Sequence, residues 1–424
     1  MKSVQSVLTL IVAGSLLNAC TSQPVIHSPP TSSTAPAITP LPPTQPHIRA
    51  TPDPVPSIVV KPAPETTPDL TSDLPPTLPA STKPIVVQGL TVAQARELLQ
   101  QLLPAGIKDR NGWRNDMLGA FTGLKIPYEA PYFCAAIAII EQESSWQSDP
   151  SVPGLGKMVW QEIEKRADKY HVPMLAIQLA MLKPSPDGRS YKTRIDALHT
   201  EKQMNAVFED LMLDANKLGL PFELKNPIRT GGPMQVSVEF AEGHIRVWPY
   251  PYAYKGSIRQ EVFSRRGGLY FGIANLLQYR VNYPHMRYRF ADFNAGRYSS
   301  RNAAFQSALN VLSKQDMVLD GDLLRYNSSQ TSTTQQVLLK LANKLGMSAS
   351  AIERDLKQEK TEGFSQTTLY QRVFDLASDK AGRTLPQQVM PQIKLVSPKI
   401  TRKLTTEWFA TRVDGRYQRC MGRL

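Results

Sequence analysis

The sequence has 424 residues, which is room for one large folded domain or two smaller ones, and a formal net charge of +13. The four histidines that follow residue 88 show no metal-ligand spacing, and no Gly-x-Ser-x-Gly or phosphate-loop motif is present. These absences exclude the commonest metal, serine-hydrolase and nucleotide-binding signatures. We therefore expect neither a metal nor a cofactor.

The first residues, Met1 to Ala19, have the pattern of a secretory signal. Lys2 gives a positive start, and Val7 to Leu17 is an apolar stretch too short to span a bilayer. The segment ends in "LLNAC", which resembles the lipobox of bacterial lipoproteins. By that resemblance Cys20 becomes the mature N-terminus and carries lipid. Thr21 rather than Asp follows it, which favours the outer membrane, on either its periplasmic face or the cell surface; the alternative is an ordinary cleaved signal.

Residues 20–88 hold the lipid-bearing cysteine and a linker rich in Pro, Thr and Ser. About half of the 35 prolines of the chain lie here. Such a composition cannot build a core and favours extended polyproline II. The linker is predicted to be disordered and to tether a folded body to a membrane.

The whole excess of positive charge lies after the linker, in residues 89–424. For an exported protein, nucleic acid is not an expected partner. Peptidoglycan or another anionic envelope polymer is more plausible, and the alternative is that a basic surface only aids solubility. Cys134 and Cys420 are either joined by a disulfide or left as two unpaired thiols.

Helical periodicity dominates the folded part, which we predict to be mainly α. A helix begins after Thr91, and "EGHIRVWPY" is the best of the few strand patterns. The other helices are predicted at Pro131–Trp146, Trp160–Tyr170, Pro173–Leu182, Arg194–Leu218, Pro233–His244, Arg259–Tyr279 and Arg301–Lys314, with four more after residue 330.

The stretch from Phe133 to Ile140 carries no charge and then runs into Glu141 and Glu143. A helix that is apolar on all sides is usually buried. Burial and the negative end of the helix dipole would both raise the pKa of Glu143, as a general acid requires. Glu141 lies about 200° around the helix from Glu143, and the apolar run does not choose between the two.

Two later segments have the composition of a ligand-binding loop. "RTGGPMQVS" combines a Gly-Gly turn with Pro233, which suits the first turn of a helix. "FNAGRYSS" interrupts a periodic pattern at Asn294 to Gly296. The alternatives are a plain helix-starting turn for the first and a helix C-cap for the second.

The order "ESSW", "GGPMQVS" and "FNAG" resembles the lytic-transglycosylase branch of the lysozyme-like superfamily. By that resemblance Glu143 is the catalytic acid and base, and it works alone. The residues implied to bind substrate are Ser144, Met234, Gln235, Phe293, Asn294 and Gly296. Phe293 stands where the family has Tyr, and a long segment separates Glu143 from Met234.

Longer runs, among them "RTGGPMQVS", "QEVFSRRGGL" and "YRFADFNAG", are similar to the YaiW-type family of outer-membrane lipoproteins. The first resemblance implies a lysozyme-like domain over 89–317 with a helical insertion of about 157–228. The helical patterns near the end of the sequence predict a helical extension over 318–424 packed on the same body. Two functions follow. One is a lytic transglycosylase that binds and cleaves peptidoglycan, and the other is a non-catalytic glycan-binding or envelope-uptake component.

Overall fold

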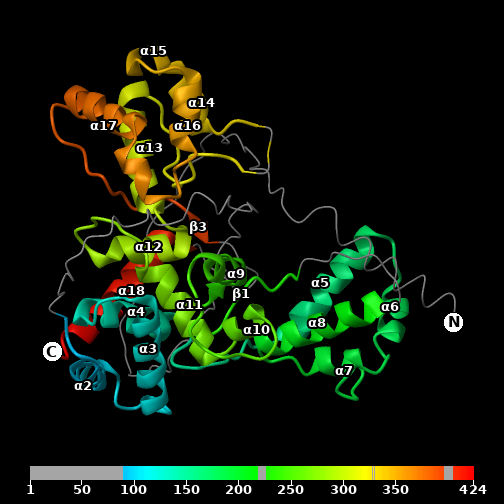
Figure 1. Cartoon of the computed structure of the whole chain (residues 1–424). Helices are drawn as coiled ribbons and strands as arrows, with labels where there is room; N and C mark the ends of the chain where they lie inside the picture. Colours follow the sequence, from blue (N-terminus) through cyan, green and yellow to red (C-terminus); the bar gives the residue numbers. More distant parts are fainter. Residues whose placement is uncertain (1–88, 218–225, 327, 329, 396–403) are drawn as a thin grey trace, which may run out of the picture. The chain divides into compact units, whose positions relative to one another are not determined.

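The computed structural model describes residues 89–217, 226–326, 328, 330–395 and 404–424 (Figure 1). The predicted lipid-bearing Cys20 and the Pro-rich linker lie outside these residues. The described part is mainly α-helical, as predicted, and each strand in it is two residues long. It divides into two units. We call residues 154–199 and 204–227 the insertion unit, and residues 89–153, 200–203 and 228–424 the main unit.

The main unit holds helices from both ends of the described chain. In order they are α2 (Val92–Leu102), α3 (Arg110–Leu124), α4 (Ala130–Glu143), α9 (Val238–Val247), α10 (Ile258–Val262), α11 (Arg265–Leu277), α12 (Met286–Ala295), α13 (Ser299–Ser313), α14 (Thr333–Lys340), α15 (Ala342–Leu345), α16 (Ala349–Leu356), the 3₁₀ turn η2 (Glu362–Gln366), α17 (Thr368–Ala381) and α18 (Thr406–Met421).

Helix α4 lies at the centre of this unit, because its neighbours in the core include α2, α11 and α18. Every residue from Phe133 to Ile140 is fully buried. The C-terminal helix α18 packs along both α4 and α12, and the chain terminus reaches α2, where the Gln101 side chain donates to the Arg423 carbonyl at 2.7 Å (Figure 1). The predicted C-terminal extension therefore contributes a helix to the centre of the main unit.

A second hydrophobic core surrounds α13. Phe305 and Leu309 of α13 are buried together with Ile352, Val373 and other apolar residues of α14, α16 and α17. Helix α13 thus belongs to the same core as the helices that follow residue 330. The chain forms this core across position 317, where the predicted C-terminal extension begins.

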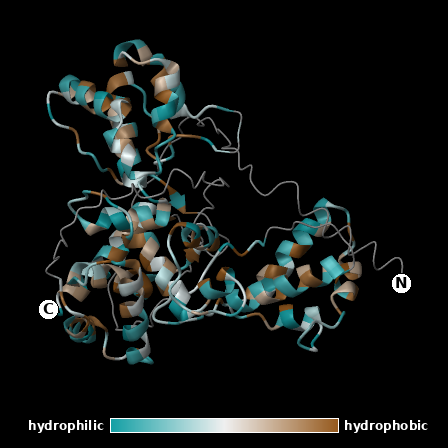
Figure 2. Ribbon diagram, viewed as in Figure 1, coloured by the Kyte–Doolittle hydropathy of each residue, from teal (hydrophilic) through white to brown (hydrophobic). Residues whose placement is uncertain are grey.

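The insertion unit is a compact group of helices in its own right. It contains α5 (Leu155–Lys169), α6 (Met174–Ala180), α7 (Tyr191–Asp196) and most of α8 (Glu201–Lys217). These helices carry both hydrophobic and hydrophilic residues (Figure 2), the pattern of helices that bury one face. The buried Arg194 joins α7 to α8 through an ion pair with Asp210 at 2.6 Å.

One helix was predicted over Arg194–Leu218, and this was wrong, because the structure has α7 and α8 with a break between them. Thr200 and Gln203 explain the break. The Gln203 amide donates to the Thr200 hydroxyl at 3.2 Å, and the Thr200 amide donates to the Gln203 side chain at 3.2 Å. This reciprocal capping box starts a new helix at Glu201.

The prediction of a helix beginning at Pro233 was also wrong. Residues 230–237 form a hairpin of β1 (Thr230–Gly231) and β2 (Val236–Ser237), with Gly232 and Gln235 in the left-handed region. Helix α9 begins only at Val238, capped by Ser237, whose hydroxyl accepts from the Phe240 amide at 3.2 Å. The predicted strand "EGHIRVWPY" was wrong too, since α9 continues to Val247. The other strand pair, β3 (Lys394–Leu395) and β4 (Leu404–Thr405), is antiparallel.

Candidate functional site

The end of α4 holds a buried acid. Glu143 is 5% exposed and Ser144, which caps the helix, is also buried. Burial and, to a smaller extent, the charge of Glu201 raise the pKa of Glu143 to about 8, and Arg416 of α18 opposes both. No described residue donates a hydrogen bond to the Glu143 carboxyl. At neutral pH this acid therefore holds a proton that it can give to a ligand.

Other polar groups at this helix end are also unpartnered. The Gln142 Oε1 and the Trp146 Nε1 are buried and have no hydrogen-bond partner among the described residues. Ser145 and Trp146 both have positive φ, 48° and 65°. Buried polar atoms without partners and left-handed non-glycine residues gather at ligand sites more often than elsewhere. The tail of α4 thus has the character of a site rather than of a simple helix end.

The structure separates the two candidate acids. Glu141 forms ion pairs with Arg419 at 3.0 Å and with Arg416 at 3.6 Å. Glu143 has no ion pair and no hydrogen bond among the described residues. Of the two acids, Glu141 is thus held by its ion pairs to α18 and Glu143 is not.

Cys134 and Cys420 are joined by a disulfide, with their Cα atoms 5.5 Å apart. This is one of the two states that the sequence left open. The bond holds the last turn of α18 against α4. Further along α4, Glu141 meets Arg416, which lies nearer the start of α18, so the two helices run antiparallel.

The second predicted segment lies on α11. The Met234 side chain is fully buried and packs where Gly272 has no side chain; a Cβ at Gly272 would lie 2.5 Å from Met234. Gln235 is 5% exposed, and its amide nitrogen donates to the Gly232 carbonyl at 3.3 Å. Both side chains therefore hold the hairpin together and fit it to the helix.

The hairpin also explains "SRRGGL", which suggested no chemistry in the sequence. Gly268 lies against Pro233, so that a Cβ there would be 2.6 Å from the proline ring. Arg265 forms ion pairs with Asp109 at 2.5 Å and Asp116 at 2.6 Å. This segment is the close-packed start of α11 and has a structural role.

The third predicted segment ends α12. Phe293 and Asn294 are buried, and the Asn294 Oδ1 accepts a hydrogen bond from the Thr406 hydroxyl at 2.8 Å. Gly296 has φ of 115° and caps the helix, so the C-cap interpretation of this segment is correct. Thr406 begins α18, which places Asn294 at the start of that helix.

A residue that the sequence reasoning missed organises this loop. Asp292 is 1% exposed and accepts from the Ser300 amide at 2.7 Å, the Tyr298 amide at 3.1 Å and the Tyr283 hydroxyl at 2.8 Å. A buried carboxylate ringed by donors fixes the chain around it. Only "FADFN", with its charge inside an apolar stretch, could have drawn attention to it.

The three segments contact the same two helices, α11 and α18, at different places along them. Trp146 contacts Trp113, which lies under Arg265 at the start of α11, and Arg297 donates to the Ala274 carbonyl at its end. On α18, ten residues separate Thr406, which bonds Asn294, from Arg416, which acts on Glu143; this is about 15 Å. Glu143 and Asn294 therefore lie near different parts of α18 and do not come together in one site.

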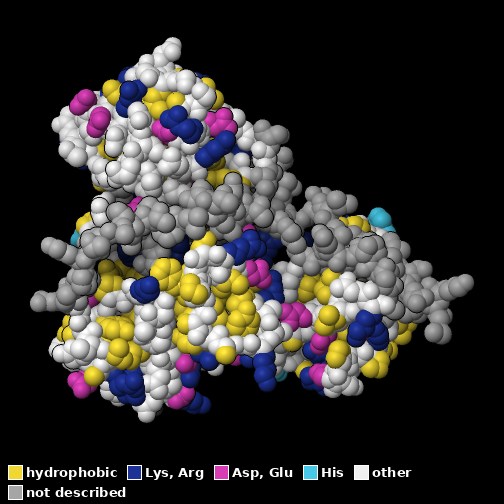
Figure 3. All heavy atoms as spheres, viewed as in Figure 1, with side chains coloured by type: hydrophobic (Ala, Val, Ile, Leu, Met, Phe, Trp, Pro, Cys, Tyr) yellow, Lys and Arg dark blue, Asp and Glu magenta, His cyan; other side chains and the backbone are white. Residues whose placement is uncertain are grey.

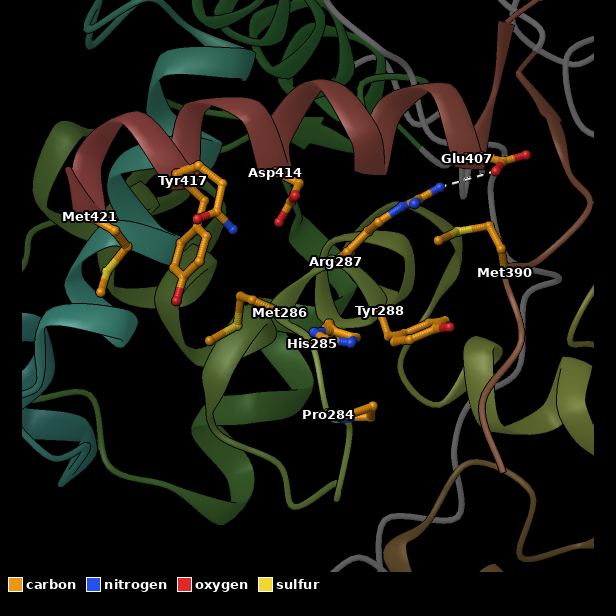
Figure 4. A pocket seen from close by; sticks show the side chains of 11 residues that line it. Pro284, His285, Met286, Arg287, Tyr288, Met390, Glu407, Asp414, Tyr417 and Met421 are labelled. Atoms are coloured by element: carbon orange, nitrogen blue, oxygen red, sulfur yellow. Dashed lines mark hydrogen bonds and ion pairs between the residues drawn. The ribbon is translucent and has the colours of Figure 1, made fainter. Parts of the chain in front are cut away.

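A pocket of about 700 Å³ lies between the first turn of α12 and α18 (Figure 4). Asp414 and Tyr417 project into it from α18, and Arg287 reaches across to Glu407 at 3.0 Å. It contains none of the predicted site residues. It also lies at the opposite end of α12 from Asn294.

Comparison with known proteins gives the family. Residues 106–423 match the family described as "Protein of unknown function (DUF1615)". The chain belongs to this family. A relative from Escherichia coli (strain K12), named "Uncharacterized protein YaiW", is 47% identical over 334 residues, which cover 79% of this chain and 91% of that protein. No solved structure matches.

The expected relation to YaiW is thus confirmed. The range matched by the DUF1615 family contains Glu143, both bonded cysteines and all of the predicted substrate-binding residues. Within the described ranges, no helix is long and apolar enough to cross a membrane. The same ranges contain no group of three His, Cys, Asp or Glu side chains that could hold a metal ion.

Proposed function

We propose that this DUF1615 protein is an outer-membrane lipoprotein whose main unit binds peptidoglycan glycan strands and cleaves them as a lytic transglycosylase. The observation that carries the proposal is Glu143, a buried acid with a pKa of about 8 and no hydrogen-bond partner among the described residues. Its position at the end of a buried apolar helix supports the resemblance to lysozyme-like enzymes.

The reaction needs one protein acid. Glu143 gives its proton to the glycosidic oxygen as the bond from that oxygen to the anomeric carbon breaks, and the leaving sugar departs as an alcohol. The Glu143 carboxylate then takes the proton of the sugar's own 6-hydroxyl as that oxygen bonds the anomeric carbon. The product is an anhydro-muramoyl end, and the acid is restored. A pKa near neutrality suits a group that must both give and take a proton.

Positive charge supports an anionic polymer as the substrate. The folded part carries the whole net charge of the chain, and Lys and Arg side chains are spread over the face seen in Figure 3 rather than gathered on one element. Positive charge that is distributed over a surface attracts an anionic polymer without confining it to one binding patch.

The experiment compares three full-length proteins, purified in detergent and incubated with peptidoglycan. Wild type and Glu141→Gln are expected to release anhydro-muropeptides, identified by mass. Glu143→Gln is expected to release them at least about 100-fold more slowly, the usual minimum loss for a general acid. Glu141 is the matched control because it lies two residues away on the same helix. Equal release by wild type and Glu143→Gln would overturn the assignment.

One set of contacts favours a second function. The side-chain nitrogen of Gln235 and the side-chain oxygen of Asn294 both form hydrogen bonds inside the protein. A protein that keeps this arrangement is suited to bind a glycan, or to serve as an uptake component, without cleaving it. Sedimentation of the wild type with peptidoglycan, together with the absence of any anhydro product, would support this alternative.

The anchor is a separate part of the proposal. Cys20, preceded by the lipobox-like "LLNA", is proposed to carry the lipid. Cells fed a clickable palmitate analogue should label the wild-type protein and leave Cys20→Ala unlabelled. Labelling of both proteins would contradict lipidation at Cys20 and would leave the proposed role of Glu143 unaffected.

A further inference from the structure

The pocket between the first turn of α12 and α18 has the composition of a ligand site. Its volume of about 700 Å³ is in the range of pockets that hold small molecules. Three methionines, two tyrosines and a proline line it together with five polar or charged residues (Figure 4). Small-molecule pockets combine apolar walls with a few polar groups that orient the ligand. The polar groups of this pocket therefore indicate which ligand it fits.

Asp414 is the charged group of the pocket that has no partner. It projects from α18 into the pocket (Figure 4), and no described residue donates a hydrogen bond to its carboxylate or forms an ion pair with it. The other carboxylate, that of Glu407, is joined to Arg287 at 3.0 Å. Counted with histidine neutral, the pocket carries one negative charge in a chain whose net charge is +13. A positively charged group complements it.

An aromatic ring lies beside this carboxylate. Tyr417 follows Asp414 by one turn of α18, so the two side chains lie on neighbouring parts of one helix face. The Tyr417 ring packs on the buried Phe290 of α12, with the ring centroids 5.8 Å apart. The face of an aromatic ring attracts a cation. A cation on Asp414 would therefore have a second favourable neighbour whose position the fold has already set.

The methionines favour an organic cation over a metal ion. Figure 4 shows Met286 and Met421 beside Tyr417 at one end of the pocket and Met390 at the other end. They do not converge on one point, as thioether ligands of a soft metal ion would. A hard cation such as Ca²⁺ takes about six or more oxygen ligands, and one free carboxylate supplies too few. Flexible, polarisable thioethers are well suited to packing against an apolar body.

We propose that the pocket between α12 and α18 binds a small organic cation, whose ammonium group lies on the Asp414 carboxylate. Its apolar body lies between Tyr417, Met286 and Met421. An ammonium group donates charge-assisted hydrogen bonds to a carboxylate, and the ring and the thioethers cover the rest of the ligand. The pocket contains none of the residues assigned to the Glu143 site, so this inference goes beyond the proposed reaction and does not depend on it.

The test uses 2-phenylethylammonium as the probe, which joins an ammonium group to an apolar ring. Full-length protein is purified in a non-ionic detergent, labelled with ¹³C at the methionine methyl groups and titrated with the probe by NMR. Loss of one signal in each of Met286→Leu, Met390→Leu and Met421→Leu identifies the pocket methionines. The Met286 and Met421 signals of wild type are expected to shift to saturation, which gives the affinity.

The role of the free carboxylate is tested by Asp414→Asn. Since Asp414 has no partner among the described residues, the change breaks no contact there that holds the fold. The affinity for the probe is expected to fall about tenfold or more, the usual loss when a hydrogen bond to a charged group is removed. Asp414→Glu keeps the charge and should bind the probe more tightly than Asp414→Asn. Asp379→Asn, at an exposed position of α17, makes the same charge change and should bind as wild type does.

Three results would overturn the proposal. One is the absence of any shift in the Met286 and Met421 signals at millimolar concentrations of the probe. Another is equal binding of 2-phenylethanol, a neutral molecule of matched size, because charge would then not direct the ligand to the pocket. The third is an equal loss of affinity in Asp379→Asn and Asp414→Asn, which would assign the effect to the charge of the whole surface rather than to the pocket.

Discussion

Two buried acids of the main unit have opposite surroundings. Asp292 accepts hydrogen bonds from two backbone amides and from the hydroxyls of Tyr279 and Tyr283, whereas no described group donates to Glu143. Burial raises both pKa values, to about 6 for Asp292 and to about 8 for Glu143, and the donors around Asp292 offset part of the effect. The contrast separates an acid that organises a loop from an acid that is free to react.

The largest expected effect follows from removing the well-bonded acid. Asp292→Ala leaves three buried donors and one partly buried donor without an acceptor, and each costs free energy when it stays unpaired. We expect the free energy of unfolding to fall by at least about 3 kcal/mol, measured by urea denaturation. Glu143→Gln, which breaks no hydrogen bond, is the control. An equally large loss of stability in Glu143→Gln would show that the hydrogen bonds of Asp292 are not the cause.

The next effect is a pH dependence that belongs to Glu143. Its pKa in the folded protein, about 8, lies above the ordinary value of 4.5, so between these values the folded protein holds a proton that the unfolded chain has released. Stability should therefore fall as the pH rises from about 5 to 8, by about 3–4 kcal/mol.

Glu143→Gln should remove this part of the slope. Denaturation of wild type and variant at pH 5 and pH 8 measures it as a difference. Glu359, which burial gives a pKa of about 7, contributes equally to both proteins and cancels. A slope that is the same in both would mean that Glu143 titrates at its ordinary pKa.

The smallest expected effect concerns Glu141, which lies on the same helix as Glu143. Glu141→Gln breaks its ion pairs with the largely exposed Arg419 and, at 3.6 Å, with the mostly buried Arg416. The exposed pair contributes little and the longer, more buried pair contributes more, so we expect a loss of about 1–2 kcal/mol, and a smaller one at high salt. A larger loss, seen in the same denaturation series, would assign Glu141 a structural weight that its exposure does not suggest.

Local signals predicted the parts of the site that one segment builds. The apolar run before Glu143 predicted a buried helix, and the glycine after Asn294 predicted a cap. The hairpin at residues 230–237 could not be predicted, because it depends on the close approach of Gly232 and Met234 to α11.

The Cys134–Cys420 disulfide also orders events in time. Cys420 follows Cys134 by 286 residues, and Cys134 belongs to the helix at the centre of the main unit. During synthesis the first thiol emerges long before its partner exists. The central helix can therefore be closed covalently only after residue 420 has been made, and a chain that stops before that residue leaves its innermost cysteine unpaired.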